Sequence, residues 1–230
     1  MKRILITGAS RGIGRAIAVR LAAADTTLLL HGRDRIALAE TRRALEAKGA
    51  RTLELLFDLQ DPAAISAMAE AIGTEPLDVL VHNAGSAVVK PFENVALHEW
   101  QANFAVNVTA PFLLTQKLAS RMPAGASIVH ILSIAAKTGF PNWSAYCTSK
   151  FALEGFSQAL REELRPRGIR VLNIYPGATA TDIWNAAEGD WPRDKMMSAG
   201  EVAEAVGFAL SRPANVAIEN LTVTNAGGAL

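Results

Sequence analysis

The chain has 230 residues, of which 50% are hydrophobic and 20% are charged, enough to bury one sizeable core. Its 23 lysines and arginines and 22 aspartates and glutamates give a net charge of +1, without a basic block that could bind a run of nucleic-acid phosphates. The apolar segment after Met1 is too short for a signal peptide or a membrane span, and Cys147 has no disulfide partner, so we expect a cytoplasmic protein without nucleic-acid, membrane or metal partners.

Short apolar runs alternate with helical patterns along the chain, and these runs are the predicted strands. Residues 28–30 and 79–81 are apolar without interruption, as expected of strands covered on both faces. Asp61 followed by Pro62 predicts a helix start, and Gly49 predicts a helix end. The predicted strands are residues 3–7, 26–31, 51–57, 77–82, 126–132, 169–175 and 220–224. This order predicts an α/β fold, a doubly wound parallel sheet of about seven strands with helices on both faces, in a single domain over residues 1–230.

A glycine-rich turn, TGASRGIG, directly follows the first predicted strand. Glycine suits a tight turn that needs positive φ, and it lets a pyrophosphate approach backbone N–H groups without an intervening Cβ. An ordinary strand-to-helix turn is the alternative interpretation, but the position after the first strand favours a dinucleotide site. The residues predicted to form it are Gly8, Ser10, Arg11, Gly12, Ile13 and Gly14.

Several motifs along nearly the whole chain occur in one family's order and spacing. They are Gly8-x3-Gly12-x-Gly14, Asn83-Ala84-Gly85, Asn107, Ser133, Tyr146-x3-Lys150 and Pro176-Gly177-x-Thr179-x-Thr181. With them the chain resembles the short-chain dehydrogenase/reductase family, in its shorter single-domain branch; His82, where the family more often has asparagine, is a departure. The resemblance implies a nicotinamide cofactor. It implies further cofactor contacts at Asp58, Leu59, Asn83, Ala84, Gly85, Tyr146, Lys150, Pro176, Gly177, Thr179 and Thr181.

The pair Tyr146 and Lys150 carries the predicted chemistry. Four residues apart on a helix, the two side chains share one face. A tyrosine with an ordinary pKa near ~10 needs a lower pKa to act as acid and base near neutrality, and an ammonium ~4 Å away contributes on the order of 4 kcal/mol at an effective dielectric of about 20. We therefore expect Lys150 to lower the pKa of Tyr146. The resemblance also implies that Lys150 binds the nicotinamide ribose.

Two polar residues complete the predicted catalytic set. Ser133, at the end of a strand, can donate its hydroxyl hydrogen to the substrate oxygen as negative charge develops. It is not expected to be a nucleophile, because strand alternation turns the nearby His130 to the other face. Asn107 lies among apolar neighbours. It is either a satisfied buried amide that holds its helix or, as the resemblance implies, part of a backbone and water relay from Lys150 to solvent.

The end of the second predicted strand bears on cofactor choice. A site for NAD usually has a carboxylate here, whereas Gly32 offers none. Arg33 and Arg11 suit the 2′-phosphate of NADP(H), although both could be ordinary surface charges. Asp34 is predicted to cap the next helix. We therefore expect NADP(H) to be preferred over NAD(H).

The residues point to an NADPH-preferring oxidoreductase that interconverts a carbonyl and an alcohol in a small-molecule substrate. The alternative, a non-catalytic NADP(H)-binding redox sensor, would keep the glycine turn and lose the Tyr146 and Lys150 pair. Residues 178–198 are predicted to form a substrate lid. Its apolar side chains and the loop facing it either line an apolar pocket or only pack the lid onto the body. These side chains are Trp184, Trp191, Met196, Met197, Phe140 and Trp143.

The helix that continues beyond Lys150 has two apolar stripes. The first, with Leu153, Phe156, Leu160 and Leu164, is sufficient to pack on the sheet. The second contains small residues that would let another helix approach closely, and the family commonly pairs this helix across a two-fold axis. We therefore expect a homodimer or homotetramer. The second stripe consists of Phe151, Ala152, Gly155 and Ala159.

Overall fold

The structure is a computed structural model that describes residues 1–186, 191–213 and 215–228. Its seven strands form one parallel sheet in the order β3-β2-β1-β4-β5-β6-β7. The strands are β1 (Lys2–Ile6), β2 (Thr26–Gly32), β3 (Arg51–Leu56), β4 (Val79–His82), β5 (Ser127–Ile131), β6 (Arg170–Pro176) and β7 (Asn220–Val223). The predicted doubly wound sheet is confirmed. The strand order reverses between β1 and β4, and such a switch point is where these sheets bind ligands.

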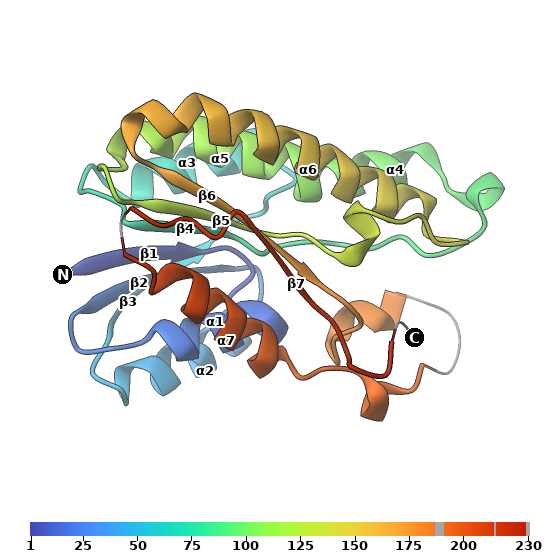
Figure 1. Ribbon diagram of the computed structural model, residues 1–230, viewed down its shortest axis with the longest axis horizontal. Helices are drawn as coiled ribbons and strands as arrows, with labels where there is room; N and C mark the ends of the chain where they lie inside the picture. Colours follow the sequence, from blue (N-terminus) through green and yellow to red (C-terminus); the bar gives the residue numbers. More distant parts are fainter. Residues whose placement is uncertain (187–190, 214, 229–230) are drawn as a thin grey trace.

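Helices cover both faces of the sheet (Figure 1). One layer contains α1 (Gly12–Leu21), α2 (Arg35–Glu46) and α7 (Ala199–Leu210). The other contains α3 (Pro62–Ala71), α4 (Leu97–Phe104), α5 (Ala110–Leu118) and α6 (Ser144–Leu164), with a π-helical segment, Ala105–Thr109, joining α4 to α5. Short 3-10 turns lie at Phe92–Asn94, Ala119–Arg121, Ile134–Ala136, Arg165–Arg167, Asp182–Ala186 and Arg193–Lys195.

The helix boundaries follow local sequence signals. The Asp34 carboxylate accepts hydrogen bonds from two backbone N–H groups of the first turn of α2, at 3.0 and 3.1 Å. The Asp61 carboxylate caps α3 by accepting a hydrogen bond of 2.8 Å from the backbone N–H of Ala63, and Pro62 occupies the first position of the helix. Gly49, with φ of +81°, follows the end of α2. Side-chain caps satisfy N–H groups that have no partner inside a helix, so these predicted starts and stops are confirmed.

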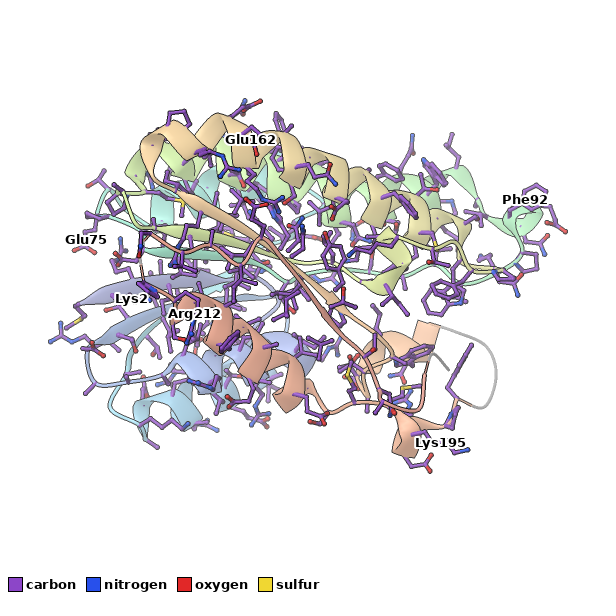
Figure 2. The ribbon with its side chains drawn as sticks, in the orientation of Figure 1. Lys2, Glu75, Phe92, Glu162, Lys195 and Arg212 are labelled. Carbon is purple, nitrogen blue, oxygen red and sulfur yellow. The ribbon has the colours of Figure 1, made fainter. Side chains whose placement is uncertain are left out.

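Alternating strand residues supply two hydrophobic cores. On β1, Ile4 and Ile6 face the core under α1, α2 and α7, whereas Leu5 faces the core under α3, α5 and α6. Successive side chains of a strand point to opposite faces, so a strand buried on both sides is apolar throughout. Because the strands are parallel, their carboxyl ends lie together at one edge of the sheet. In Figure 2 that edge is the end with Phe92 and Lys195, opposite Lys2.

Two buried histidines face each other across neighbouring strands. His82 on β4 is in register with His130 on β5, and their rings stack with centroids 5.1 Å apart and planes 13° apart. His82 Nε2 lies 2.8 Å from the hydroxyl oxygen of Thr115 on α5. Burial disfavours the charged imidazolium, so it lowers the pKa of His130 to about 3 and holds the pKa of His82 well below its ordinary value. Both rings are therefore neutral in the folded protein near neutral pH.

These histidines are expected to make the fold acid-sensitive. Because their folded-state pKa values are lowered, their stabilisation is complete above the unfolded pKa of about 6.5 and is lost as the pH falls below it. For His130 the free energy of unfolding should fall by about 1.4 kcal/mol per pH unit between about pH 6 and about pH 4, and His82 adds to the loss in the same direction. Urea unfolding at several pH values measures this slope. In His130→Leu the slope should be smaller by that amount, and an unchanged slope would contradict the assignment.

The second apolar stripe of α6 lies on the surface. Gly155 and Ala159 are exposed, Phe151 is 46% exposed, and Phe112 on the neighbouring α5 is 43% exposed. Self-association through this face stays a prediction. Among the residues that the structure describes, no helix has both the length and the apolar character needed to cross a membrane.

Candidate active site

The glycine turn between β1 and α1 has conformations that only glycine accommodates well. Gly8 and Gly12 have φ values of +67° and +55°. A Cβ on Gly14 would collide with the carbonyl oxygen of Gly8, so this close crossing of the chain requires glycine. Asn83, after β4, donates from Nδ2 to the carbonyl oxygens of Thr7 and Gly8 at 2.9 and 3.1 Å. The turn is thus held from the neighbouring strand, with its backbone open to a phosphate.

A groove of about 490 Å³ runs from this turn along the carboxyl ends of the strands. Its volume lies within the range of about 300 to 1,000 Å³ usual for ligand pockets, and its glycine cradle fits a dinucleotide pyrophosphate. Fourteen of the eighteen residues predicted to contact the cofactor line this groove. They are Gly8, Ser10, Arg11, Gly12, Ile13, Arg33, Asp58, Leu59, Asn83, Ala84, Gly85, Tyr146, Lys150 and Thr181.

The remaining four predicted cofactor residues lie elsewhere. Gly14 is beneath the turn, where it supports the loop without lining the groove. Pro176, Gly177 and Thr179 line a neighbouring cavity, because β6 extends through Pro176 and directs the following backbone there. Ile13, Tyr146 and Thr181 line both the cavity and the groove, and the contact of Pro176, Gly177 and Thr179 with the cofactor stays a prediction.

His31, at the end of β2, is a groove residue that the sequence reasoning missed. Its Nδ1 accepts a hydrogen bond of 3.3 Å from the backbone N–H of Gly8, and its Nε2 lies 3.0 Å from the carbonyl oxygen of Phe57. Burial lowers the pKa of His31, which favours a neutral ring that can accept at one nitrogen and donate at the other. The side chain thereby ties the glycine turn to β2 and to the end of β3.

The two arginines of the groove are exposed and only loosely paired. Arg33 lies 4.0 Å from the Asp58 carboxylate, and Arg11 lies 3.5 Å from the Asp182 carboxylate. Exposed pairs at such distances contribute little to stability. The Asp34 carboxylate is engaged by the start of α2. Both guanidinium groups are therefore able to reorient toward an anion in the groove.

Tyr146 and Lys150 lie at the start of α6, where the groove meets the neighbouring cavity. Both side chains line the groove, and Tyr146 lines the cavity as well. Lys150 Nζ donates a hydrogen bond of 2.9 Å to the carbonyl oxygen of Ile131, at the end of β5. The same nitrogen lies 5.6 Å from the ring centroid of Tyr146. The structure thus brings the two side chains to one place, with the ammonium anchored on the sheet.

The pKa of Tyr146 differs from the sequence-based expectation. Burial raises the pKa of Tyr146 to about 12, although a hydrogen bond with Ser133 lowers it. Burial also lowers the pKa of Lys150 to about 8. The predicted lowering of the tyrosine pKa by Lys150 is wrong for the protein by itself, because loss of hydration disfavours the phenolate more than its neighbours favour it. Tyr146 therefore holds its proton at neutral pH.

Ser133 lies two residues beyond β5 and caps the short helix Ile134–Ala136. Its Oγ accepts a hydrogen bond of 3.1 Å from the backbone N–H of Ala135. A hydroxyl that accepts in this way keeps its own hydrogen available as a donor. Ser133 also lines the cavity next to Tyr146, so its hydrogen can be directed to an oxygen placed there.

Asn107 lies in the π-helical segment and is almost completely buried. Its Oδ1 accepts from the backbone N–H of Ser86, and its Nδ2 donates to the Ser86 carbonyl and to Ser149 Oγ, each at 2.9 Å. Ser149 in turn donates to the carbonyl oxygen of Tyr146 at 2.7 Å. Both N–H donors of Asn107 are used, so the side chain is a satisfied amide that fixes the first turn of α6. The relay to solvent stays a prediction.

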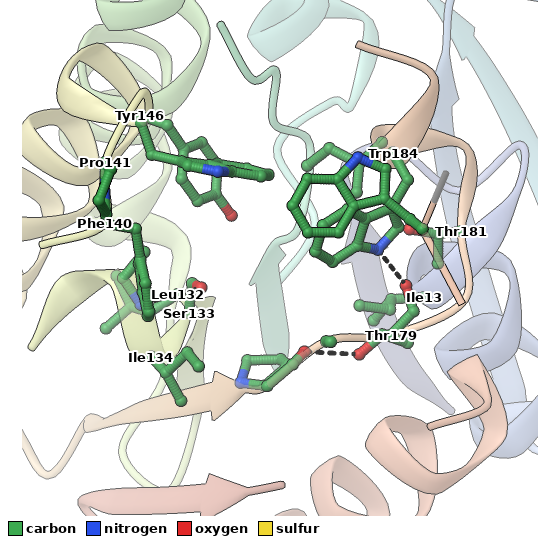
Figure 3. A pocket seen from close by; sticks show the side chains of 17 residues that line it. Ile13, Leu132, Ser133, Ile134, Phe140, Pro141, Tyr146, Thr179, Thr181 and Trp184 are labelled. Carbon is green, nitrogen blue, oxygen red and sulfur yellow. Dashed lines mark hydrogen bonds between the residues drawn. The ribbon is translucent and has the colours of Figure 1, made fainter. Parts of the chain in front are cut away.

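The neighbouring cavity has a volume of about 270 Å³ and is lined mainly by apolar side chains. Figure 3 shows the Tyr146 hydroxyl directed into it, with Phe140 and Pro141 on one side and Trp184 and Thr181 on the other. Trp184 Nε1 donates to the carbonyl oxygen of Thr179 at 2.9 Å.

The predicted lid is only partly described. Within it, residues 187–190 lie outside the described residues, whereas Trp184 and Trp191 line the cavity. Met196 and Met197 are buried and do not line it, and Met197 belongs to the core under α1 and α7. These two methionines therefore pack the predicted lid onto the rest of the protein and do not line the apolar pocket.

Known proteins share this arrangement. A family model described as short chain dehydrogenase matches residues 2–191, which include the glycine turn, Ser133, Tyr146 and Lys150. The chain belongs to the short-chain dehydrogenase family. D-threitol dehydrogenase of Mycolicibacterium smegmatis is 34% identical over 234 residues, covering 91% of this chain and 86% of that protein.

Solved structures of dehydrogenases agree with the fold of this one. A short chain dehydrogenase from Burkholderia cenocepacia in complex with NADP has a TM-score of 0.87 and 32% identity, covering 97% of this chain and 96% of that one. An alcohol dehydrogenase from the archaeon Thermococcus sibiricus, complexed with 5-hydroxy-NADP, has a TM-score of 0.89 and 25% identity, covering 99% and 98%. As a member of this family, the protein is an oxidoreductase of alcohol and carbonyl groups that uses a nicotinamide cofactor.

Proposed function

We propose that this short-chain dehydrogenase is an NADPH-preferring carbonyl reductase in which Tyr146 protonates the substrate oxygen. The observation that carries the proposal is the position of the Tyr146 hydroxyl at the junction of the dinucleotide groove and the apolar cavity. A ketone or aldehyde in the cavity would place its oxygen at this hydroxyl. Because Tyr146 retains its proton at neutral pH, it is suited to donate one.

The residues around Tyr146 have separable roles in this proposal. Reduced nicotinamide, when bound in the groove, supplies the hydride. Ser133 donates a hydrogen bond to the oxygen as it gains negative charge. Lys150 would hold the ribose hydroxyls and stabilise negative charge on Tyr146 after proton transfer. Asn107 is a positioning residue, since it acts through Ser86 and Ser149.

A redox sensor is the competing interpretation, and one assay distinguishes the two. A sensor requires the groove alone, whereas an enzyme also requires the cavity beside Tyr146. NADPH oxidation measured with a panel of ketones and aldehydes should give turnover with at least one of them. NADPH binding without turnover across the panel would favour the sensor.

The preference for NADPH rests on the charges at the end of β2. Gly32 contributes no carboxylate, and Arg33 and Arg11 line the groove with only weakly held partners. A 2′-phosphate there would form charge-assisted hydrogen bonds with guanidinium groups. The NADP and 5-hydroxy-NADP found in the two similar structures support this assignment.

Arg33→Ala is expected to weaken NADPH binding far more than NADH binding. The lost charge-assisted hydrogen bond corresponds to roughly 1.5 to 3 kcal/mol, and only the 2′-phosphate would make it. Fluorescence titration with each cofactor measures the two affinities. Arg43→Ala is a matched control, because Arg43 is an exposed residue of α2 that does not line the groove. Equal losses for NADPH and NADH would refute the assignment.

We also infer that the exposed apolar faces of α5 and α6 pair in a homodimer or homotetramer. Phe112 and Phe151 are large apolar side chains left partly in water, and Gly155 has no neighbour within 4 Å of an added Cβ, leaving room for a second helix.

A further inference from the structure

The cavity beside Tyr146 has a wall of unusual composition. Among the described residues that line it, no side chain carries a charge. Its hydroxyls belong to Ser133, Tyr146, Thr179 and Thr181, and that of Thr179 donates to the carbonyl oxygen of Gly177 at 3.0 Å. Ser133 and Tyr146 are both directed at the reacting oxygen in the proposed function. Other polar groups on the wall include the Thr181 hydroxyl and Trp191 Nε1, which is buried without a hydrogen-bond partner among the described residues. A substrate with more hydroxyls than these few groups can pair would leave polar groups without partners in this cavity.

Tryptophan rings form one part of the cavity wall. This aromatic wall consists of Trp143, Trp184 and Trp191, whereas Phe140 lines the cavity on the side opposite Trp184 (Figure 3). Trp143 contacts Tyr146 edge to face, with centroids 5.5 Å apart and planes at 69°. The group next to a carbonyl held by Tyr146 would thus lie against Trp143. Three of the chain's four tryptophans gather here, and the fourth, Trp100, stacks on Phe104 in α4 instead.

The tryptophans pack on one another instead of forming a cage. The centroid of Trp143 lies 5.5 Å from that of Trp184 and 6.4 Å from that of Trp191, with planes at 70° and 80°. Trp184 and Trp191 are 4.8 Å apart. A cation bound by several rings lies within about 6 Å of each ring face, which requires the rings to stand apart around it. The aromatic wall has no such gap, and none of the described residues that line the cavity carries a carboxylate. A neutral ring that contacts the wall fits better than a cation does.

The size of the cavity limits the ligand. An engineered apolar cavity of about 150 Å³ binds benzene. The present cavity, of about 270 Å³, therefore holds one ring with a short side chain, or two fused rings.

We propose that the substrates are neutral carbonyl compounds bearing a one- or two-ring aromatic group, which packs against the aromatic wall while the carbonyl oxygen meets Tyr146 and Ser133. This inference rests on the proposed function, since it places the carbonyl at Tyr146. It predicts that polyols and sugars are poorer substrates than these compounds.

A pair of ketones isolates the contribution of the aromatic ring. Benzylacetone and its cyclohexyl analogue have equally unconjugated carbonyls, and the saturated ring is slightly larger, so hydrophobicity alone would favour the analogue. With NADPH as cofactor, kcat/KM should be roughly tenfold higher for benzylacetone, because ring pairs add attraction beyond area burial. Dihydroxyacetone, a hydroxylated ketone, should be the poorest of the three. Equal or reversed values for the two ring ketones would overturn the inference.

Substitutions in the aromatic wall test whether it causes the preference for benzylacetone. Trp184→Leu should raise the KM for benzylacetone roughly tenfold with little effect on kcat, whereas Trp184→Phe should retain most of the preference because it keeps a ring. Trp100→Leu is the matched control and should leave kcat and KM unchanged for both ring ketones. Thermal unfolding of each variant verifies that it is folded. An unchanged KM in Trp184→Leu would refute the role of the wall.

A binding measurement distinguishes failure of this inference from failure of the proposed function. Calorimetric titration of benzylacetone into protein saturated with NADP⁺ requires no turnover. If binding is seen and is weakened in Trp184→Leu, the wall is a ligand site even when no ketone is reduced, and only the proposed reaction fails. If dihydroxyacetone is reduced efficiently while benzylacetone does not bind, the reaction stands and the substrate class is wrong.

Discussion

Tyr146→Phe is expected to lower kcat by roughly 10²- to 10⁴-fold while NADPH affinity stays nearly unchanged, because the substitution removes only the transferable proton. The ring should remain in place, since it packs in a cluster with Ala135 and Cys147 and contacts Trp143. Steady-state NADPH oxidation gives kcat, and fluorescence titration gives the cofactor affinity. Substantial residual turnover would exclude Tyr146 as the proton donor.

The other tyrosine of the chain provides the matched control. Tyr175 lies on β6, is 1% exposed, and has its hydroxyl oxygen 2.6 Å from a Glu154 carboxylate oxygen and 2.9 Å from Asn220 Oδ1, within donating distance of either. Tyr175→Phe should therefore lower stability without lowering kcat, since a buried hydrogen-bond network loses its centre. A similar loss of kcat in both variants would indicate a general effect of removing a buried hydroxyl.

Lys150→Met is expected to damage both turnover and cofactor binding. It keeps the length of the buried chain but removes the ammonium that donates to the carbonyl oxygen of Ile131. We expect kcat to fall by at least about a hundredfold, in the range of a lost acid/base contribution, and NADPH affinity to fall with it. The same two assays used for Tyr146→Phe measure both. If NADPH affinity is unchanged in Lys150→Met, Lys150 does not bind the nicotinamide ribose.

The pH dependence of cofactor binding tests the charge of Lys150 separately. Since the folded-state pKa of Lys150 is lowered to about 8, the ammonium is present below this pH and is lost above it. NADPH affinity of the wild-type protein should therefore decline as the pH rises through about 8, and in Lys150→Met it should be flat over the same range. Thermal unfolding of the variant verifies that the unpaired Ile131 carbonyl has not disrupted β5.

Local signals in the sequence were sufficient for the fold and for part of the candidate site. The strands were predicted to within two residues at each end, because a strand buried on both faces has an uninterrupted apolar run. The capping by Asp34 and Asp61 was predicted because each cap involves groups only two or three residues away. The spacing of Tyr146 and Lys150 predicted a shared helix face for the same reason.

Contacts between distant segments were outside the reach of local signals. His31 holds the glycine turn from another strand, and Asn107 joins Ser86, in the loop after β4, to Ser149 on α6. Neither residue has a neighbour in the sequence that indicates its partner. Likewise, the position of Met197 in the core under α7 depends on how residues 191–198 return to the body.

The sequence by itself determined the doubly wound sheet, its helix caps and the glycine turn, because each follows from periodicity or from backbone needs within a few residues. Only the tertiary structure decided that the pKa of Tyr146 is raised, because burial depends on elements that enclose the side chain from several directions. It also decided that Pro176 and Gly177 face the cavity and that three tryptophans meet there. Those positions depend on how chain segments far apart in sequence pack at the carboxyl edge of the sheet, where no local pattern specifies which side chains become neighbours.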